Sequence, residues 1–466
     1  MKRIALKIRE HSLYTLLSAL IPALIRFIPE MMFPYPIGFD TPLYLAMAKD
    51  FAAHPQPFRL FIVIIGLLHV LGVDLMVAMK FLPTLVYCLL GFSIFKFANR
   101  HLGWRDYHAL LASINLTISV AMLRISWDMH KLALGVALLL LTLSMSKTLY
   151  VSEPTRLDAG RIAFFTLSML TLITHELIAV LFMLTLIYYA LRRRESRLFL
   201  ITLLACCMSL FFGLWYWDRF SEVFGWIPAI FQSPPLSRFW PELQENGGLM
   251  VKLFPLYIPF IIIGFFRDGT LRVWTAFALF GSFSTLISPT FFLGGVLPWR
   301  YILLLAVPFS LYSIKGLMVL AKNVRPIAFL ALILLVNLPS LSFVGLTDAF
   351  AIYTSEGTIP KNMVQTCIPL HDIGPTIRLL KNVTDGVLIV YGDFVGWASY
   401  FSNAKVVTFG GTYPHTQTLE DALRISEGEN NIYLLYWDDD VAANLGFKII
   451  ATDGHLKLYK YAEGVT

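Results

Sequence analysis

Phe81-Leu-Pro-Thr-Leu-Val-Tyr-Cys-Leu-Leu-Gly-Phe-Ser-Ile-Phe95 carries no charged side chain and forms the centre of a longer apolar stretch over residues 78–97. An α-helix needs about 20 mostly apolar residues to cross the hydrocarbon core of a bilayer. The stretch therefore predicts a transmembrane helix. Because similar runs recur through most of the chain, insertion into a membrane, rather than a water-soluble core, decides the fold.

The recurring runs predict an α-helical, polytopic membrane protein with about eleven transmembrane helices. The pair formed by the fifth and sixth helices is divided because Thr174-His175-Glu176 would otherwise place two ionisable groups in hydrocarbon, at about 2.5 kcal/mol or more for an acid at the centre. The expected spans lie near 11–28, 78–97, 106–123, 131–149, 162–174, 177–191, 198–217, 251–266, 272–290, 300–320 and 326–345.

The composition agrees with this class. Of the 466 residues, 57% are hydrophobic and 14% are charged, whereas soluble proteins average about 25% charged residues. The net charge of +7 does not predict a nucleic-acid partner, because the Lys and Arg residues lie mainly between the apolar runs. The four cysteines show neither a disulfide framework nor zinc-site spacing.

The orientation follows from those cations. One set of connections, which includes the Arg192-Arg193-Arg194 run, carries about twice as many Lys and Arg residues as the other. The positive-inside rule places this set and the N-terminus in the cytoplasm. With an odd number of spans, the chain after about residue 350 is then extracytoplasmic. We therefore expect a multi-pass protein of the cell membrane.

The composition changes near residue 350, so the chain divides into a transmembrane domain, 1–350, and a small α/β domain, 351–466. Apolar runs at 386–391, 405–409 and 432–436 predict buried strands, with a helix at 418–425 and a terminal hairpin around Asp453-Gly454. About 115 residues suffice for one core.

Two acids lie next to predicted spans on the outer face. Asp40 stands in Ile37-Gly-Phe-Asp-Thr-Pro-Leu-Tyr44, and Asp128 stands in the tight turn Arg124-Ile-Ser-Trp-Asp-Met-His-Lys131. A carboxylate so near the bilayer is costly unless it faces a cavity, a cation or water. The alternative is that each acid caps a helix or reaches out to solvent.

Two further groups fall on the same face by this topology. His175-Glu176 lies between the fifth and sixth spans, and Arg300 begins the tenth span within Leu297-Pro-Trp-Arg-Tyr301. The alternatives are a helix-end histidine for His175 and an interfacial anchor for Arg300. Acids, imidazoles and cations from separate turns suit transfer from a phosphate-linked donor, because an acceptor hydroxyl needs a base and a departing phosphate needs cations.

The order of these elements resembles a known superfamily. After the first helix come Gly-Phe-Asp-x-x-x-Tyr44, the stretch Phe61–Gly72, Phe-Ala-Asn-Arg-His-Leu-Gly103 and then Ser126-Trp-Asp, followed later by Trp299-Arg300-Tyr301. This order is similar to that of the polytopic GT-C glycosyltransferases that use polyprenyl-phosphate or dolichyl-phosphate sugars. They include protein O-mannosyltransferases, lipid A aminoarabinose transferases and oligosaccharyltransferases. The resemblance covers roughly residues 12–320 and implies a hexosyltransferase-type activity.

The resemblance implies roles for single residues. Asp40 would be the base or a metal ligand and Asp128 the second acid. The Asp128-Met-His130 sequence is similar to a metal-binding motif of archaeal oligosaccharyltransferases, which would add a divalent Mn or Mg ion on Asp40, Asp128 and His130 and suggests an archaeal source. The donor phosphate would be held by Arg300, Lys131 and Arg124, with Tyr44, His130, His175 and Glu176 in support.

Two stretches of the C-terminal domain are further candidates for a functional role. Asp393-Phe-Val-Gly-Trp397 keeps the Asp and the later Trp of an oligosaccharyltransferase motif but lacks its Trp-Trp pair and Tyr-Gly, which does not favour recognition of an acceptor sequon. Tyr436-Trp-Asp-Asp-Asp440 is acidic, follows a predicted strand and is interpreted as a solvated loop.

The sequence therefore favours a membrane glycosyltransferase that moves a sugar from a polyprenyl-phosphate donor to a protein, glycan or lipid acceptor at the outer face. Three alternatives stay open. They are a metal-dependent enzyme like an oligosaccharyltransferase, a protein that binds lipid-linked sugar without catalysis, and a transporter of lipid or solute. A transporter would place ionisable groups at the midplane of the membrane and break its helices.

Overall fold

A computed structural model describes fifteen ranges of residues of the chain. The chain divides into two compact units. The helical unit comprises Met1–Met32, Pro57–Phe61 and Phe81–Lys361, and the sheet unit comprises Phe33–Gln56, Ile62–Lys80 and Asn362–Thr466. The predicted boundary near residue 350 lies outside the described residues. The described ranges are 2–36, 38, 40–52, 59–146, 159–192, 200, 203–204, 207–208, 236–254, 256–267, 271–286, 298–320, 326–338, 368–410 and 418–462.

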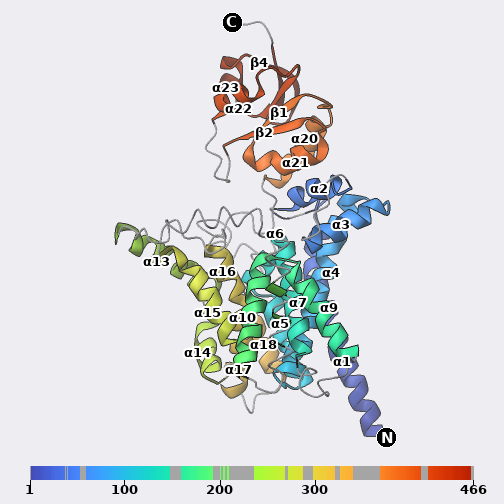
Figure 1. The fold of residues 1–466 in the computed structure, drawn as a ribbon, viewed down its shortest axis with the longest axis vertical. Helices are drawn as coiled ribbons and strands as arrows, with labels where there is room; N and C mark the ends of the chain where they lie inside the picture. Colours follow the sequence, from blue (N-terminus) through green and yellow to red (C-terminus); the bar gives the residue numbers. More distant parts are fainter. Residues whose placement is uncertain are drawn as a thin grey trace. The chain divides into compact units, whose positions relative to one another are not determined.

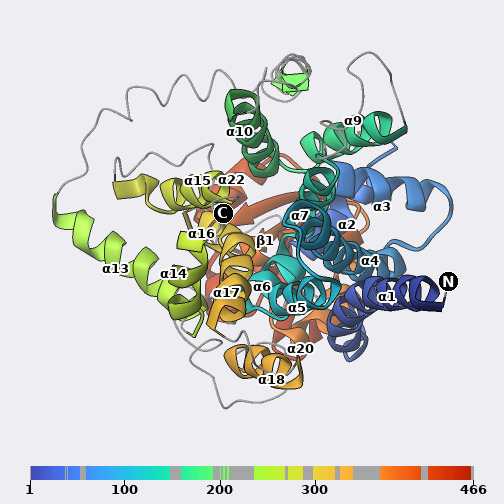
Figure 2. The same ribbon diagram turned by 90° about the horizontal axis from the view of Figure 1, so that it is seen from below.

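The helical unit is built from apolar helices that lie side by side (Figures 1 and 2). Helices α3 and α4 each contribute residues to both units. The bounds are α1 Lys2–Met31, α3 Leu60–Val70, α4 Leu75–Lys96 with a π-turn η1 at Phe97–His101, α5 Asp106–Thr117, α6 Val120–Asp128, α7 His130–Ser144, α9 Ala159–Leu172, α10 Glu176–Arg192, α13 Leu236–Leu253, α14 Ile258–Arg267, α15 Arg272–Ser282, a 3-10 turn η2 at Ser284–Leu286, α16 Pro298–Leu304, α17 Ala306–Leu320 and α18 Pro326–Val336.

Several of these helices have the length and composition of membrane spans. Within the described residues, three helical stretches qualify, namely Arg9–Met31, Leu75–His101 and Trp299–Leu320, and up to five qualify if each of two bent pairs counts as one span. The prediction of about eleven spans stays a prediction. The predicted division of the fifth and sixth spans is confirmed, because α9 ends at Leu172 and α10 begins at Glu176.

Two of the expected spans contain a bend that was not predicted, although each bent pair can still count as one span. Residues 106–123 form α5 and the start of α6, which meet at 63°. Ser119 accepts a hydrogen bond from the N–H of Met122 and so begins a new helix there. Residues 251–266 cross a 91° bend between α13 and α14.

Glycines allow α14 and α17 to pack backbone to backbone. A Cβ atom added at Gly264 would lie 1.9 Å from the carbonyl oxygen of Tyr312, and one added at Gly316 would lie 2.2 Å from that of Phe260. Each helix thus uses one glycine to admit the other. Small residues have this role in membrane helix pairs, where close van der Waals contact replaces the hydrophobic effect.

The sheet unit contains a five-stranded mixed sheet with the order β2-β1-β3-β5-β4. The strands are β1 Val387–Tyr391, β2 Lys405–Phe409, β3 Ile432–Tyr436, β4 Phe447–Asp453 and β5 Leu456–Tyr461. Strand β1 pairs in parallel with β2 and β3, while β5 pairs antiparallel with β3 and β4. The predicted strands and terminal hairpin are confirmed. The predicted helix is α22, Leu419–Ser426, which begins with a capping box at Thr418.

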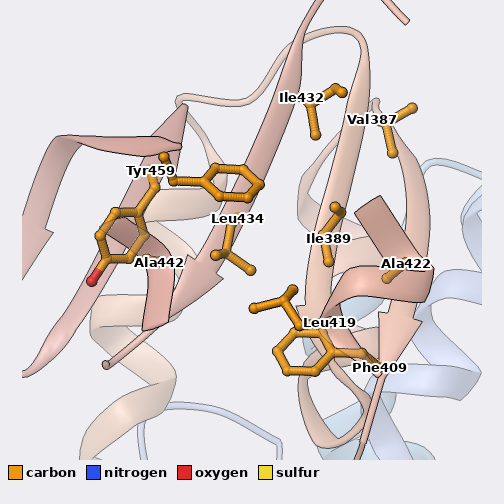
Figure 3. Packing of buried hydrophobic residues seen from close by; sticks show 10 residues of the cluster. Val387, Ile389, Phe409, Leu419, Ala422, Ile432, Leu434, Ala442 and Tyr459 are labelled. Atoms are coloured by element: carbon orange, nitrogen blue, oxygen red, sulfur yellow. The ribbon is translucent and has the colours of Figure 1, made fainter. Parts of the chain in front are cut away.

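The apolar face of the sheet carries the core of this unit (Figure 3). Ile389 of β1 and Leu434 of β3 are completely buried and point toward Leu419 of α22 and Phe409 of β2. Four further short helices complete the unit: α2 Thr41–Lys49, α20 Leu370–Leu380, α21 Val395–Phe401 and α23 Asp439–Asn444, together with a 3-10 turn η5 at Gly392–Phe394. They were not predicted from the sequence.

Helix α2 belongs to this unit because it packs on α21. A Cβ atom at Gly396 of α21 would lie 2.8 Å from the backbone nitrogen of Leu43, so only glycine fits there. At the other end of α2, the Lys49 ammonium donates to the carbonyl oxygens of Tyr400, 2.9 Å away, and Ser402, 3.2 Å away. A cation at the C-terminal end of a helix is favourable, so Lys49 fixes α2 along α21.

Candidate functional site

A tryptophan flanked by two arginines forms the centre of the candidate site. The guanidinium carbon of Arg124, in α6, lies 5.6 Å from the centroid of the Trp299 ring, and that of Arg300 lies 5.4 Å from it. Trp299 and Arg300 lie in the first turn of α16. Cation–π contacts hold both guanidinium groups near one aromatic ring, although the two positive charges repel each other.

The Trp299 cluster lies at one end of the helical unit. Figure 1 shows α6 and α16 at the end opposite to the N-terminus of α1. If the N-terminus is cytoplasmic, as the distribution of Lys and Arg predicts, then this end faces outward. The predicted phosphate-binding residues Arg124 and Arg300 therefore share one end of the unit.

More cations surround His175 in the turn between α9 and α10. The charges of Lys131, Arg300 and Arg59 all act on its imidazole. Lys131 and Arg300 also act on the carboxylate of Glu176. The structure thus brings Lys131, His175, Glu176 and Arg300 into one electrostatic neighbourhood. Arg59 was not predicted, although it directly precedes the apolar stretch of α3.

His175 has a defined structural role. Its Nδ1 accepts a hydrogen bond from the N–H of Leu177, 3.2 Å away, and so caps the N-terminus of α10. Burial lowers the pKa of His175 to about 4, against the opposing effect of Glu176 and with the help of Lys131, Arg300 and Arg59. The imidazole is therefore neutral near pH 7 and keeps its proton on Nε2. The alternative of a helix-end histidine fits this geometry.

Arg300 carries an unused donor. Its Nε atom is buried and has no hydrogen-bond partner among the described residues. A buried guanidinium N–H without a partner costs about 1–3 kcal/mol or more. Arg300 lies among other charged groups, because Arg59, Lys131 and Arg300 all act on His175, and Lys131 and Arg300 also act on the carboxylate of Glu176. A buried guanidinium donor that is open, with other cations nearby, is suited to an anionic ligand such as a phosphate.

The turn between α6 and α7 is as short as predicted. Helix α6 ends at Asp128 and α7 begins at His130. His130 is 1% exposed and its ring packs against Phe61, with 5.3 Å between the ring centroids. The side chain of Asp128 lies outside the described residues. The predicted metal ligands Asp128 and His130 therefore stay a prediction.

Asp40 and Tyr44 lie together in the sheet unit. Asp40 is the N-cap residue of α2, and its backbone carbonyl accepts the first helical hydrogen bond from Tyr44, at 3.0 Å. The Tyr44 hydroxyl, which is buried, also donates to the Asp40 carboxylate over 3.4 Å. Asp40 itself is half-buried. The docking of α2 on α21 through Gly396 fixes the helix that carries it.

The stretch Asp393–Trp397 belongs largely to the core of the sheet unit. Trp397 is completely buried, and its Nε1 atom has no hydrogen-bond partner among the described residues. Its place in α21, beside the close contact of Gly396 with α2, gives the tryptophan a packing role. The structure gives no further support for the partial likeness to an acceptor-recognition motif.

The interpretation of Tyr436–Asp440 as a solvated loop is correct in part: Asp439 and Asp440 are exposed, but they begin helix α23 instead of a loop. Asp438 caps α23 by accepting hydrogen bonds from the N–H groups of Asp440 and Val441. Asp439 pairs with Lys457 and accepts a hydrogen bond from the Tyr459 hydroxyl at 2.6 Å. The hydrogen bonds from Lys457 and Tyr459 lower the pKa of Asp439. These acids begin a helix and fix it to β5.

Two ionisable residues in α1 were not among the site residues predicted from the sequence. Arg26 and Glu30 are both completely buried and form an ion pair across one helical turn. Arg26 also donates to the carbonyl oxygen of Ser126 at 3.4 Å and covers the Trp127 ring. The signal was the presence of Arg26 inside an apolar run, with an acid four residues later. An ionisable residue in a membrane helix usually has a named partner and a role.

Comparison with known proteins gives a weak likeness to a solved structure. No protein-family model matches the chain, and no curated protein matches it in sequence. Among solved structures, the crystal structure of ArnT from Cupriavidus metallidurans bound to undecaprenyl phosphate matches with a TM-score of 0.46 and 11% sequence identity. The match covers 96% of this chain and 97% of that chain.

Proposed function

We propose that the protein is a membrane glycosyltransferase that takes a sugar from a polyprenyl-phosphate donor. The observation that carries the proposal is the set of cations around Trp299, with Arg124 and Arg300 on the ring and a buried Arg300 Nε without a partner. A lipid phosphate would satisfy that donor.

Such a site has a chemical reason to lie at the membrane face. The polyprenyl tail stays in lipid while the head group reaches the cations. As the bond between the sugar and the phosphate breaks, negative charge develops on the departing lipid phosphate. Preorganised Arg and Lys side chains stabilise that charge more than they stabilise the ground state. In this proposal Arg300, Arg124 and Lys131 hold the phosphate, while Glu176 and His175 fix the surrounding charges.

The attacking hydroxyl of the acceptor needs a base. We assign this role to Asp40, with Asp128 and His130 in support, on the basis of the order of the motifs along the chain. Asp40 removes the proton of the acceptor hydroxyl while the hydroxyl oxygen attacks the sugar carbon. If a Mn or Mg ion takes part, it would lower the charge of the phosphate and be held by carboxylates. A chelator separates the two versions, because it abolishes transfer only in the metal-dependent one.

The donor site is tested by lipid binding to the full chain in nanodiscs. The probes are undecaprenyl phosphate and dolichyl phosphate, and the variant is Arg300→Gln. We expect a loss of affinity of about tenfold or more, because a hydrogen bond to a charged group contributes about 1.5–3 kcal/mol. The matched control is Arg272→Gln, which removes an arginine that lies 5.5 Å from the ring centroid of Phe265. Equal affinity of the two variants, or no binding by the unchanged chain, would contradict the proposal.

Catalysis is tested separately with Asp40→Asn. We expect transfer of sugar from a polyprenyl-phosphate sugar to be abolished, while binding of the lipid phosphate and thermal stability are retained. Binding without transfer in the unchanged chain, over a range of sugars and acceptors, would instead identify a non-catalytic binder of lipid-linked sugar.

A transporter is the second candidate, and one observation favours it. Helices α5 and α6 form a single apolar stretch that is bent by 63°, and discontinuous helices are common at the binding sites of transporters. Movement of a fluorescent polyprenyl phosphate across proteoliposomes would support this candidate. The glycosyltransferase proposal expects no such movement.

A further inference from the structure

A group of two histidines and one aspartate lies in the sheet unit, apart in sequence from every residue of the proposed donor site. His371 and Asp372 lie in the first turn of α20, and His455 lies in the turn between β4 and β5. One potential ligand atom from each of the three residues lies within 4.8 Å of those of the other two. We propose that these three residues bind a divalent transition-metal ion, with Zn²⁺ as the preferred ion.

The distances fit a metal better than they fit hydrogen bonds. Nε2 of His371 lies 3.4 Å from Oδ1 of Asp372, and Nδ1 of His455 lies 3.5 Å from the same oxygen. Hydrogen bonds between nitrogen and oxygen are usually about 2.7–3.2 Å long. Ligands of a tetrahedral Zn²⁺ with bonds of about 2.0–2.1 Å stand about 3.3–3.5 Å from each other, and both distances from the carboxylate oxygen to the imidazole nitrogens have this length.

The carboxylate is the unusual member of the group. Asp372 is 4% exposed, and within the described part of the chain its oxygens have no hydrogen-bond donor at normal distance. Its near neighbours are the two imidazole nitrogens. A buried carboxylate is normally paired or bound to a metal, because burial of an unpaired charge is expensive. A metal ion on Oδ1 would provide the missing partner.

The surrounding structure fixes the ligands in place. Arg378 of α20 donates two hydrogen bonds to Asp453 of the β4–β5 turn, at 2.6 and 3.1 Å. This pair holds the turn that carries His455 against the helix that carries His371. Gly454 has a φ of +63°, a conformation that favours glycine and that turns the chain toward His455. A metal at the three ligands would add a second connection between α20 and the hairpin.

The ligand types select the class of ion. Imidazole suits Zn²⁺, Cu²⁺, Fe²⁺ and Ni²⁺, whereas Mg²⁺ and Ca²⁺ prefer oxygen ligands. Two histidines and one carboxylate leave at least one coordination position open, which water can fill. His371 and His455 are exposed, with 76% and 55% of their side-chain surface accessible, so an ion can enter from solvent. The inference does not depend on the proposed transferase activity.

The experiment uses the full chain, purified with a tag that contains no histidine, and Zn²⁺ alone as the probe. Isothermal titration calorimetry should show a site with a stoichiometry of one, and saturation should raise Tm. His371→Ala and His455→Ala should each weaken Zn²⁺ binding at least tenfold. These side chains are exposed, so the variants should fold. Mg²⁺ in place of Zn²⁺ should produce no such heat.

The matched control is His69→Ala, which removes an exposed histidine from the last turn of α3. It should bind Zn²⁺ like the unchanged chain. The proposal is overturned if the chain binds no Zn²⁺ at a stoichiometry of one, or if His371→Ala and His455→Ala bind as well as His69→Ala does. Neither result affects the test with lipid phosphate, because that test measures a different ligand.

Discussion

The guanidinium carbon of Arg26 lies 3.5 Å from the centroid of the Trp127 ring, and both side chains are completely buried. Arg26 comes from the end of α1 and Trp127 from the end of α6, one residue before Asp128. Glu30 pairs with the same guanidinium. The turn that contains the second predicted acid is therefore packed on an ion pair of the first helix.

Removing one member of this pair should be far more harmful than removing both. Arg26→Met leaves the Glu30 carboxylate buried without its cation, which typically costs about 3–5 kcal/mol. The double variant Arg26→Met, Glu30→Gln should recover much of that stability. The measurement is the free energy of unfolding in mixed micelles together with Tm. Arg9→Met, which changes an exposed arginine of the same helix, serves as the control, and equal stability of the single and double variants would contradict the pairing.

His175 should make the protein less stable in weak acid. Its pKa is about 4 in the folded chain and about 6.5 in an unfolded chain. Below pH 6.5 the unfolded chain therefore takes up a proton that the folded chain does not. The stabilising contribution of neutral His175 is complete above pH 6.5 and falls by about 3 kcal/mol as the pH drops towards 4.

Two substitutions separate this effect from catalysis. His175→Asn keeps an acceptor for the N–H of Leu177 and should remove the pH dependence of Tm between pH 4 and 6.5 while retaining most of the stability at pH 7. His175→Ala should lose about 1 kcal/mol through the missing cap. Loss of sugar transfer in a stable His175→Asn protein would show that the imidazole does more than cap the helix.

Gly396→Ala should disturb the helix that carries Asp40. The added Cβ would lie 2.8 Å from the backbone nitrogen of Leu43, so α2 or α21 has to move. We expect a loss of about 1–3 kcal/mol in stability and a larger proportional loss of transfer activity. Gly247→Ala in α13 is the control, because nothing lies within 4 Å of its added Cβ, and it should be neutral or slightly stabilising. Normal activity in Gly396→Ala would separate Asp40 from the chemistry.

Lys131→Met should weaken binding of a lipid phosphate and leave the fold intact. Lys131 is half-buried and acts on both His175 and Glu176. Loss of one charged donor should lower affinity about tenfold to a hundredfold, with a weaker salt dependence of binding. Lys315→Met, a half-buried lysine of α17, is the matched control. A titration of undecaprenyl phosphate at two salt concentrations would reveal whether the two variants differ.

Much of the local structure was predictable from the sequence. The strands at 387–391, 405–409 and 432–436 follow from continuous apolar runs, and the terminal hairpin follows from Asp453-Gly454. The break between α9 and α10 follows from the cost of His175 and Glu176 in hydrocarbon. In each of these segments, neighbours in sequence decide the structure.

The bends and the short helices were harder to predict. The 63° bend between α5 and α6 depends on Ser119 hydroxyl bonds within an otherwise apolar run, and hydropathy does not register them. Helix α21 carries Gly396 and Trp397. The glycine is needed because α21 packs closely against α2, which lies more than 350 positions earlier in the chain. Contacts of that kind leave no periodic pattern in a single sequence.

The candidate site was predicted in part. The predicted topology places Arg124, Lys131, His175 and Arg300 on one face. That placement stays a prediction, while the structure brings the four residues near one another within the helical unit. The Arg26–Glu30 pair was missed because mean hydropathy over an apolar run does not register one ion pair within it. Arg59 was missed because a cation in a long loop resembles an ordinary surface residue. The role of Trp299 as the ring between two arginines depends on tertiary packing.

The Lys49 contact with the carbonyl of Tyr400 joins residues that are 351 positions apart. At about 5–20 residues per second, the ribosome needs roughly 20–70 s to make the chain between them. Helix α2 therefore leaves the ribosome long before α21 exists. It cannot pack on α21 while the intervening helices enter the membrane. The order of synthesis thus makes the sheet unit the last to fold. A translation pause or a truncation before α21 would leave the segment that carries Asp40 without the helix on which α2 packs.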